Sequence, residues 1–255
     1  KKNQNKKVLC LQTHIAETTI SMFSAVDVLL KWGEENDTEK KLKFFGGEVN
    51  SSIPTGSLRM QYELENSKPS NDISEIDILV IGINAALWKG TSKTIYDIYY
   101  EQMNWVVKIS KKYPNLNIVY KHHPTFKRDI KEKEIYSNSN IKPIIIPKNN
   151  SLNSYHFLSK SKLCISFASS MIIEGLSEKN NCFFLDPNSK NDIFFNNLEY
   201  LNDVRIKSYK ELETLVKNMF YNKKYFQKLE PQKFCLNRLK TVDKIYNYIN
   251  KFKND

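Results

Sequence analysis

The stretch Leu163-Cys-Ile-Ser-Phe-Ala-Ser-Ser-Met-Ile-Ile-Glu-Gly-Leu176 decides the fold of this chain. Its first five residues are typical of a buried strand, Ser169–Ser170 predicts a tight turn, and a helix is expected over Ser170–Lys179. A second apolar strand, Leu116–Lys121, runs into His122–His123–Pro124. If the two strands are parallel in one sheet, their carboxyl ends meet at the same edge. They would then offer hydroxyls, backbone N–H groups, a lysine and an imidazole to a phosphate group.

Strand and helix patterns alternate regularly from residue 76 onward. Besides the two strands above, we expect strands at Ile76–Ile83, Ile141–Pro147 and Asn181–Asp186, with amphipathic helices between them. Nearly continuous apolar strands separated by such helices indicate a parallel sheet that is covered on both faces. The predicted fold class is α/β, a Rossmann-like parallel sheet preceded by a partial N-terminal α/β segment.

The first 70 residues show a different organisation. Strands are expected at Lys7–Gln12 and Val26–Trp32, whereas Ile53–Ser57 is rich in turn-forming residues. The polar segment Tyr62–Ser74 is the best candidate for a linker, so we predict one domain over residues 1–70 and another over 71–255. Since the first residue is not Met, we expect a region upstream of this sequence. At the other end, a helix over Gln232–Phe252 is expected to present one apolar stripe, made of Leu239, Val242, Tyr246, Ile249 and Phe252.

Composition narrows the class of protein. Hydrophobic residues make up 40% of the chain, enough for a sizeable core, and no apolar run approaches the length of a membrane span. The four cysteines are far apart in sequence and form no CxxC pair, so reduced thiols in a cytoplasmic protein are expected.

The net charge of +11 is unevenly distributed. Residues 205–255 hold 13 of the 39 Lys and Arg residues but only 5 of the 28 Asp and Glu residues. This basic region does not coincide with the candidate phosphate site, so specific nucleic-acid binding is disfavoured. Two explanations of the charge stay open: peripheral contact with the anionic inner face of the plasma membrane, and a Lys-rich codon bias.

Ligands of parallel α/β sheets bind beyond the carboxyl ends of the strands, which places Asn84 and Pro147 among the candidates for nucleotide contacts. At Ser169–Ser170, exposed N–H groups at the start of a helix favour phosphate, and the neighbouring Met171 belongs to the same turn. The alternative is a simple helix cap, since Ser is a preferred capping residue. Glu174 follows Ser170 by four residues, not by the three of a capping box, so both side chains share a helix face. Such a carboxylate can accept hydrogen bonds from a ribose diol, although a solvent-facing Glu is the simpler interpretation.

The histidine pair follows the alternation of a strand. One imidazole is expected to face the core and the other the ligand crevice, and Pro124 favours extended backbone at His123. A fixed imidazole can donate to a phosphate oxygen or transfer a proton near neutral pH, although a purely structural pair remains an alternative. No Cys or acidic residue stands at the spacing of a metal site, so no metal is predicted. GxGxxG and Walker patterns are absent as well, which disfavours a dinucleotide oxidoreductase or a P-loop enzyme.

These motifs resemble those of the donor-binding half of GT-B-type glycosyltransferases. Lys-x-His-Pro after a strand, followed some 45 residues later by Ser-Ser-x-x-x-Glu-Gly-Leu, is most similar to bacterial surface-polysaccharide enzymes. These include the Kdo-transferase and sialyltransferase groups with "HP" and "SS" motifs, and CDP-glycerol glycerophosphotransferases are a related comparison. The resemblance covers roughly Val26–Lys217 and extends to Ser154–Tyr155, Asp186–Pro187 and Thr55–Gly56–Ser57.

The resemblance implies a metal-independent glycosyltransferase that acts in capsule or lipopolysaccharide biosynthesis. His123 would be catalytic, and the donor phosphate would lie against Lys121, His122, Pro124, Ser169, Ser170 and Met171. Glu174, with Asn84 and Pro147, would hold the ribose and the base.

The donor would be a nucleotide-sugar, with CMP slightly favoured over UDP or CDP. No other cofactor is expected, and the acceptor would be a glycan or a lipid-linked sugar, held by the acceptor-side segment 1–70. No residue matches the element that supplies the general base. Two alternatives stay open, a UDP-sugar 2-epimerase on the same fold and a non-catalytic module that binds nucleotides or polyanions.

Overall fold

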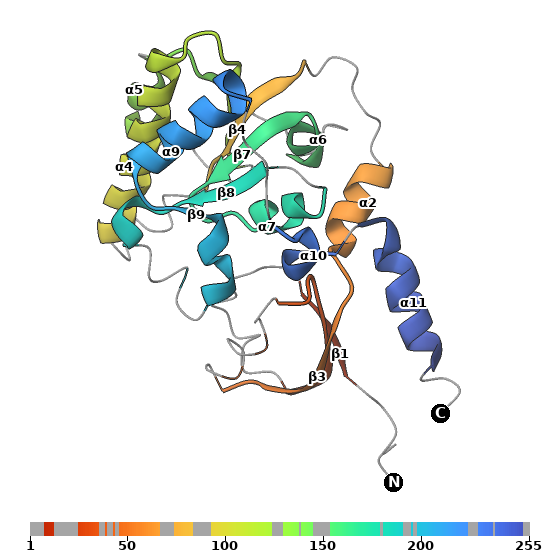
Figure 1. Ribbon diagram of the computed structural model, residues 1–255. Helices are drawn as coiled ribbons and strands as arrows, with labels where there is room; N and C mark the ends of the chain where they lie inside the picture. The colour runs from red at the N-terminus through yellow and green to blue at the C-terminus, as the bar shows by residue number, and fades with distance from the viewer. Residues whose placement is uncertain are drawn as a thin grey trace.

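The computed structural model describes a defined set of residues, and it shows two parallel β-sheets with helices packed around them (Figure 1). These residues are 8–12, 25–35, 39, 43, 46–66, 74–83, 93–123, 130–137, 139–144, 154–178, 181–190, 195, 198–223, 229–236 and 238–251. The predicted α/β class is confirmed, since every strand pair in both sheets is parallel.

The larger sheet has six strands in the order β6-β5-β4-β7-β8-β9. Five of them coincide with predicted strands; β4, β5, β7 and β8 are almost entirely buried, whereas the edge strand β6 is largely exposed. The short β9 was not predicted, since two residues are too few to show the alternation of apolar and polar residues that marks a strand. The strands are β4 (Ile76–Ile81), β5 (Ile118–Lys121), β6 (Lys142–Ile144), β7 (Ser161–Ser166), β8 (Asn181–Leu185) and β9 (Arg205–Ile206).

Helices cover both faces of this sheet, as Figure 1 shows, with α4, α5 and α9 on one side and α6 and α7 on the other. The longest helix is amphipathic as expected, and its apolar stripe from Ile95 to Ile109 is buried in the main core. The helices are α4 (Lys93–Lys112), α5 (Ile130–Ser137), α6 (Ser154–Ser159), α7 (Met171–Leu176) and α9 (Tyr209–Val216). Shorter turns are η2 (Pro187–Ser189), η3 (Glu199–Val204) and η4 (Lys217–Tyr221).

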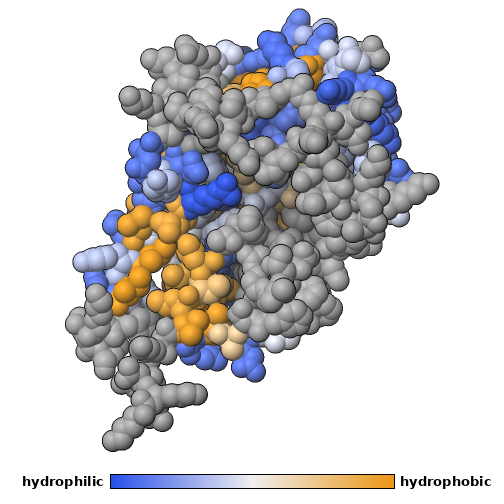
Figure 2. All heavy atoms as spheres, turned by 180° about the vertical axis from the view of Figure 1, so that it is seen from behind, coloured by the Kyte–Doolittle hydropathy of each residue, from blue (hydrophilic) through white to orange (hydrophobic). Residues whose placement is uncertain are grey.

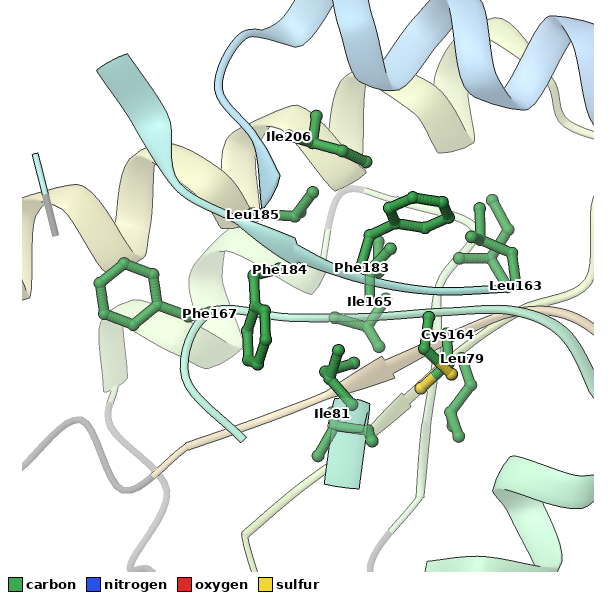
Figure 3. Close-up of a cluster of buried hydrophobic side chains, with 14 of the residues drawn as sticks. Leu79, Ile81, Leu163, Cys164, Ile165, Phe167, Phe183, Phe184, Leu185 and Ile206 are labelled. Atoms are coloured by element: carbon green, nitrogen blue, oxygen red, sulfur yellow. The ribbon is translucent and has the colours of Figure 1, made fainter. Parts of the chain in front are cut away.

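Apolar side chains of β4, β7 and β8 form part of one buried cluster (Figure 3). Cys164 and Cys182 are directly opposite each other in the register of these strands. Both are free thiols with no solvent exposure, and Cys235 is a third buried free thiol. The predicted core position is therefore confirmed for Cys164 and Cys182, and Cys235 shares it, whereas Cys10 is half-buried.

The N-terminal segment forms a three-stranded sheet in the order β1-β2-β3, followed by helix α2. Neither β3 (Glu48–Pro54) nor α2 (Leu58–Asn66) was predicted. The edge strand β3 was not predicted because most of its residues are polar. The expected linker, Tyr62–Ser74, begins inside α2, where buried Met60 and Gln61 anchor a helix that has few other apolar residues. The two remaining strands are β1 (Leu9–Leu11) and β2 (Ala25–Lys31).

The C-terminal residues return to the N-terminal segment. The backbone N–H of Leu236 donates to the carbonyl of Trp32 at 2.9 Å, and that of Glu34 donates to Gln232 at 3.1 Å. Gly33 is required here, because a Cβ atom would lie 2.3 Å from the backbone of Phe234. The proposed division at residue 70 stays a prediction, but residues assigned to the second unit contact the first.

One expected helix is broken into three pieces. The segment that was predicted as a single helix forms α10 (Pro231–Phe234), the turn η5 (Arg238–Lys240) and α11 (Thr241–Lys251). The described residues of its apolar stripe are largely exposed, from 37% at Ile249 to 64% at Tyr246, whereas Phe252 lies outside the described residues. Figure 2 shows that apolar atoms also gather on the surface seen from behind. The spacing of apolar residues therefore predicted the position of α11, but it did not predict that this apolar face is exposed. No helix in the described part of the chain is long and apolar enough to cross a membrane.

Candidate functional site

The larger sheet reverses its strand order at β4. From this strand the chain moves first to β5 and β6 on one side and then to β7, β8 and β9 on the other. Ligands of open α/β sheets bind at such a switch point. Lys121 at the end of β5 and Ser166 at the end of β7 are both in register with Ile81, so their backbones are about 10 Å apart, two strand spacings. The prediction that both strand ends meet at one edge is confirmed.

Lys121 is a buried cation at this edge. Its side chain is 3% exposed, and Nζ donates a hydrogen bond to the backbone carbonyl of His122 at 3.2 Å. No carboxylate among the described residues forms an ion pair with it. Burial, and secondly the guanidinium of Arg59, lower the pKa of Lys121 to about 8. The site therefore holds a positive group that lacks a negative partner.

The two histidines point in different directions, as strand alternation predicted. His122 is buried, its Nδ1 lies 2.9 Å from Glu132 Oε1, and its ring packs edge-on against Tyr120. Its predicted contact with the donor phosphate is not supported by this inward orientation. His123 is half-buried, and burial together with the charge of Lys121 lowers its pKa. A neutral imidazole is therefore the dominant form of His123 at neutral pH.

Close packing behind the histidines fixes the end of β4. A Cβ atom at Gly82 would lie 2.3 Å from the hydroxyl oxygen of Tyr120, so this position requires glycine. The Tyr120 hydroxyl also forms a hydrogen bond of 2.8 Å with that of Tyr99 on α4. The sequence placed Gly82 within the expected strand Ile76–Ile83 but did not reveal this contact, because nothing local indicates a tyrosine from the next strand.

The Ser169–Ser170 turn separates β7 from α7. The Oγ of Ser169 accepts a hydrogen bond from the backbone N–H of Met171 at 3.3 Å. Ser170 occupies the N-cap position in helical backbone, but its side chain makes no capping hydrogen bond, so the simple cap interpretation is wrong for this residue. Both serines and Met171 are half-buried. The Ser170 hydroxyl has no hydrogen-bond partner within the described residues and is the polar group that a ligand could use.

Glu174 is held one turn farther along α7. Its side chain is only 2% exposed, and both carboxylate oxygens accept hydrogen bonds from the Tyr155 hydroxyl at 3.1 Å. Oε1 also accepts a short hydrogen bond from the Ser57 hydroxyl. Burial raises the pKa of Glu174 to about 7, against the opposing effects of Ser57, Tyr155 and Arg59. The solvent-facing alternative for Glu174 is therefore wrong.

Sequence reasoning gave Ser57 and Tyr155 no role, although both lie in stretches that carry the resemblance. Their contacts with Glu174 span 117 and 19 residues, which no local pattern can reveal. Three predicted site residues, Asn84, Pro124 and Pro147, lie outside the described residues. Within the described part of the chain, no group of three or more His, Cys, Asp or Glu side chains could hold a metal ion.

Searches by sequence found no relatives: no family model matches the chain, and no curated protein matches it. Solved structures do match. A UDP co-structure of S. aureus MnaA superposes with a TM-score of 0.54 and 16% identity, covering 90% of this chain and 60% of that protein. UDP-GlcNAc 2-epimerase from Neisseria meningitidis, bound to UDP-GlcNAc, superposes with a TM-score of 0.54 and 15% identity, covering 90% of this chain and 62% of that protein.

A putative UDP-N-acetylglucosamine 2-epimerase from Listeria monocytogenes gives a TM-score of 0.55 at 10% identity, over 90% of this chain and 61% of that one. At such identities the likeness shows the fold alone. The chain therefore has the Rossmann-like, GT-B-type fold of these proteins and spans about three fifths of their length. The resemblance to GT-B enzymes is supported at the level of the fold, but the Kdo-transferase and sialyltransferase groups are not singled out.

Proposed function

We propose that this chain is the nucleotide-sugar-binding part of an enzyme that acts on a UDP-sugar, in the manner of the UDP-GlcNAc 2-epimerases that share its fold. The observation that carries this proposal is the composition of the sheet edge at the switch point. Among the described residues, a buried lysine that forms no ion pair, a half-buried neutral imidazole and a serine hydroxyl that makes no hydrogen bond lie at or just beyond the carboxyl ends of β5 and β7. Together they complement a diphosphate, and the buried Glu174 complements hydroxyl groups.

Each residue has a distinct task in this proposal. Lys121 neutralises the diphosphate, and its burial makes the attraction stronger than it would be in water. His123 donates a hydrogen bond to a phosphate oxygen from its neutral ring, so no second buried charge is needed. Ser169 and Ser170 bind the opposite side of the phosphates, and Glu174 accepts hydrogen bonds from the ribose. In the leaving-group step, these contacts stabilise the negative charge that develops on the nucleotide.

A glycosyltransferase is the second candidate, and one observation favours it. Inversion at carbon 2 of a sugar requires groups that remove and return a proton. The buried carboxylates Glu132 and Asp186 face His122 and Arg205 respectively, so neither is available for that role. Glycosyl transfer needs only leaving-group stabilisation from this half of the fold. In that case UDP, CMP and CDP donors are all compatible with the described residues.

Nucleotide binding is tested first by thermal unfolding with UDP, UDP-GlcNAc, CMP, CDP and GDP at millimolar concentration. A ligand at 100 times its dissociation constant stabilises the protein by about 2.7 kcal/mol, and UDP compounds are expected to give the largest shift. H123A should abolish the shift. K142A is the matched control, since exposed Lys142 begins the neighbouring strand β6 at the opposite end of the sheet. Equal shifts for all nucleotides, or a full shift in H123A, would refute the assignment.

The reaction is tested by incubation with UDP-GlcNAc in D₂O. Epimerisation replaces the hydrogen on carbon 2 with deuterium from the solvent, which mass spectrometry detects. Release of UDP that requires an added glycan acceptor, without deuterium incorporation, would instead identify the chain as part of a transferase.

We also propose a cytoplasmic enzyme with peripheral contact to an anionic membrane, where a glycan or lipid-linked acceptor would be reached. Support comes from the exposed apolar stripe of α11, which lies in the strongly basic last fifth of the chain. Co-sedimentation with phosphatidylglycerol vesicles, and not with phosphatidylcholine vesicles, is the expected result. Equal recovery with both would contradict the proposal.

A further inference from the structure

Ser57 occupies a position that a ligand would be expected to fill. It lies in the crossover between the N-terminal sheet and α2, 117 residues away from Glu174, and yet its hydroxyl donates to Oε1 of that carboxylate. Ser57 is 1% exposed, so this contact is sealed from water. The second donor to Glu174 is Tyr155, which belongs to the same unit as Glu174. Of these two donors, only Ser57 comes from the N-terminal segment.

We propose that Ser57 is a specificity-determining residue, whose hydroxyl holds the place of a ligand hydroxyl on Glu174. This inference rests on the proposed nucleotide site. A ligand that carries vicinal hydroxyls, such as the ribose of UDP, replaces the Ser57 donor and loses little, because the carboxylate keeps its hydrogen bonds. A ligand without these hydroxyls leaves Ser57 in place and makes no contact with Glu174. The exchange therefore favours ribonucleotides over nucleotides that lack the ribose diol.

The exchange also has a defined cost within the protein. Ser57 Oγ accepts a hydrogen bond from the backbone N–H of Met60 at 3.2 Å, so the same hydroxyl caps α2. The preceding residue, Gly56, has a φ of 97° and approaches Thr241 so closely that a Cβ atom would lie 2.3 Å from its Oγ1. Farther along α2, the side chain of Gln61 accepts from the backbone N–H of Val242 at 3.0 Å. Loss of the Ser57 contact should therefore weaken the N-terminal cap of α2 and, through Gly56 and Gln61, the contacts between α2 and α11.

The alternative is a permanent tether in which Ser57 only fastens the crossover to α7. The two possibilities differ in the sign of one measurement. If Ser57 competes with the ligand, its removal strengthens nucleotide binding, whereas removal of a tether or of a ligand contact leaves binding unchanged or weakens it. Loss of folding stability is expected in both cases and decides nothing.

The test is the affinity of the full chain for UDP and for 2′,3′-dideoxy-UDP, measured by isothermal titration calorimetry. S57A is expected to bind UDP about two- to tenfold more tightly than the unmodified protein, the range that corresponds to one net hydrogen bond. Its affinity for dideoxy-UDP should not change. S57T, which restores a hydroxyl, should return UDP binding to the original value. S57G removes the hydroxyl with less damage to a helix N-cap than Ala causes, and it replaces S57A if that variant does not fold.

S177A is the matched control. The Ser177 hydroxyl donates to the backbone carbonyl of Glu174 at 2.7 Å and does not touch its carboxylate, so UDP affinity should not change. Unchanged or weaker UDP binding by S57A and S57G would overturn the role of Ser57 while leaving the nucleotide site intact. If neither the unmodified protein nor the Ser57 variants bind UDP, both the inference and the proposed function fail. UDP binding by the variants alone would support the inference in its strongest form.

Discussion

The buried carboxyl group of Glu174 should make the stability of this protein fall as the pH rises from about 5 to 8. In the folded protein its pKa is about 7, because burial disfavours the charged form. In the unfolded chain the pKa returns to the ordinary value of 4.5. Between these values the folded state holds a proton that the unfolded state has lost. The stabilising contribution is therefore complete below pH 4.5 and disappears as the pH rises through 7.

The magnitude follows from the size of this shift. Each pKa unit corresponds to about 1.4 kcal/mol, and integration from pH 5 to pH 8 gives a loss of about 2.5 kcal/mol from Glu174 alone. E174Q retains a side-chain oxygen that accepts from Ser57 or Tyr155 but has no titration. The difference in the free energy of unfolding between the two proteins should therefore change by that amount across the pH range.

The assay is urea denaturation of the unmodified protein and E174Q at pH 5, 6, 7 and 8. Subtracting the two curves removes the contributions of every other titrating group, including Lys121 and His123. E199Q is the control, because Glu199 is an exposed carboxylate on the short turn η3, and its curve should follow that of the unmodified protein. Parallel curves for the unmodified protein and E174Q would refute the reasoning, since they would mean that Glu174 is ionised in the folded state at little cost.

Three further predictions concern residues around the site. G82A should destabilise the fold by about 1–3 kcal/mol in urea denaturation, because the added Cβ meets the Tyr120 hydroxyl first. The G82A/Y120F double variant should recover part of this stability, and no recovery would show that the clash lies elsewhere. R205A should cost about 3–5 kcal/mol, since it removes an ion pair from the fully buried carboxylate of Asp186, and R205K should recover only part of this loss. Binding of UDP at pH 8 should be accompanied by uptake of about half a proton, because Lys121 titrates near that pH and a diphosphate favours its charged form. Calorimetry in two buffers of different ionisation enthalpy measures the proton uptake, and K121M should abolish it.

The sequence was sufficient for five of the six strands of the larger sheet and for the edge at which the candidate site lies, and the reason is physical. Strands buried on both faces, such as β7, are apolar almost throughout, and the rule that ligands bind at their carboxyl ends then selects Lys121, His123 and Ser169–Ser170. Alternation along the chain also separated the inward His122 from its outward neighbour. These features are local, so a pattern of a few residues records them.

What the sequence did not reveal depends on contacts between distant segments. The edge strand β3 carries no apolar alternation, and the exposed stripe of α11 has the same period as a buried one. The largest omission was the environment of Glu174, because its position in sequence indicated a ligand contact but not that Ser57 and Tyr155 already enclose the carboxylate. Helical spacing fixes which side chains share a face; it does not determine which segment covers that face.

The two buried charged groups at the candidate site, Lys121 and Glu174, favour the proposed ligand for a common reason. Lys121 and Glu174 are buried close to one sheet edge, where an ion pair would be the usual way to offset their desolvation. In this protein Lys121 donates to a backbone carbonyl and Glu174 accepts from hydroxyl groups, so neither is neutralised by the other. Burial moves the pKa of each toward neutrality, to about 8 and about 7 respectively. A nucleotide-sugar supplies the diphosphate that Lys121 lacks and hydroxyls that can replace Ser57, so one ligand would satisfy both groups at once. The absence of an ion pair at either group among the described residues of the free protein is then the proposed source of selectivity for a ligand that carries both features.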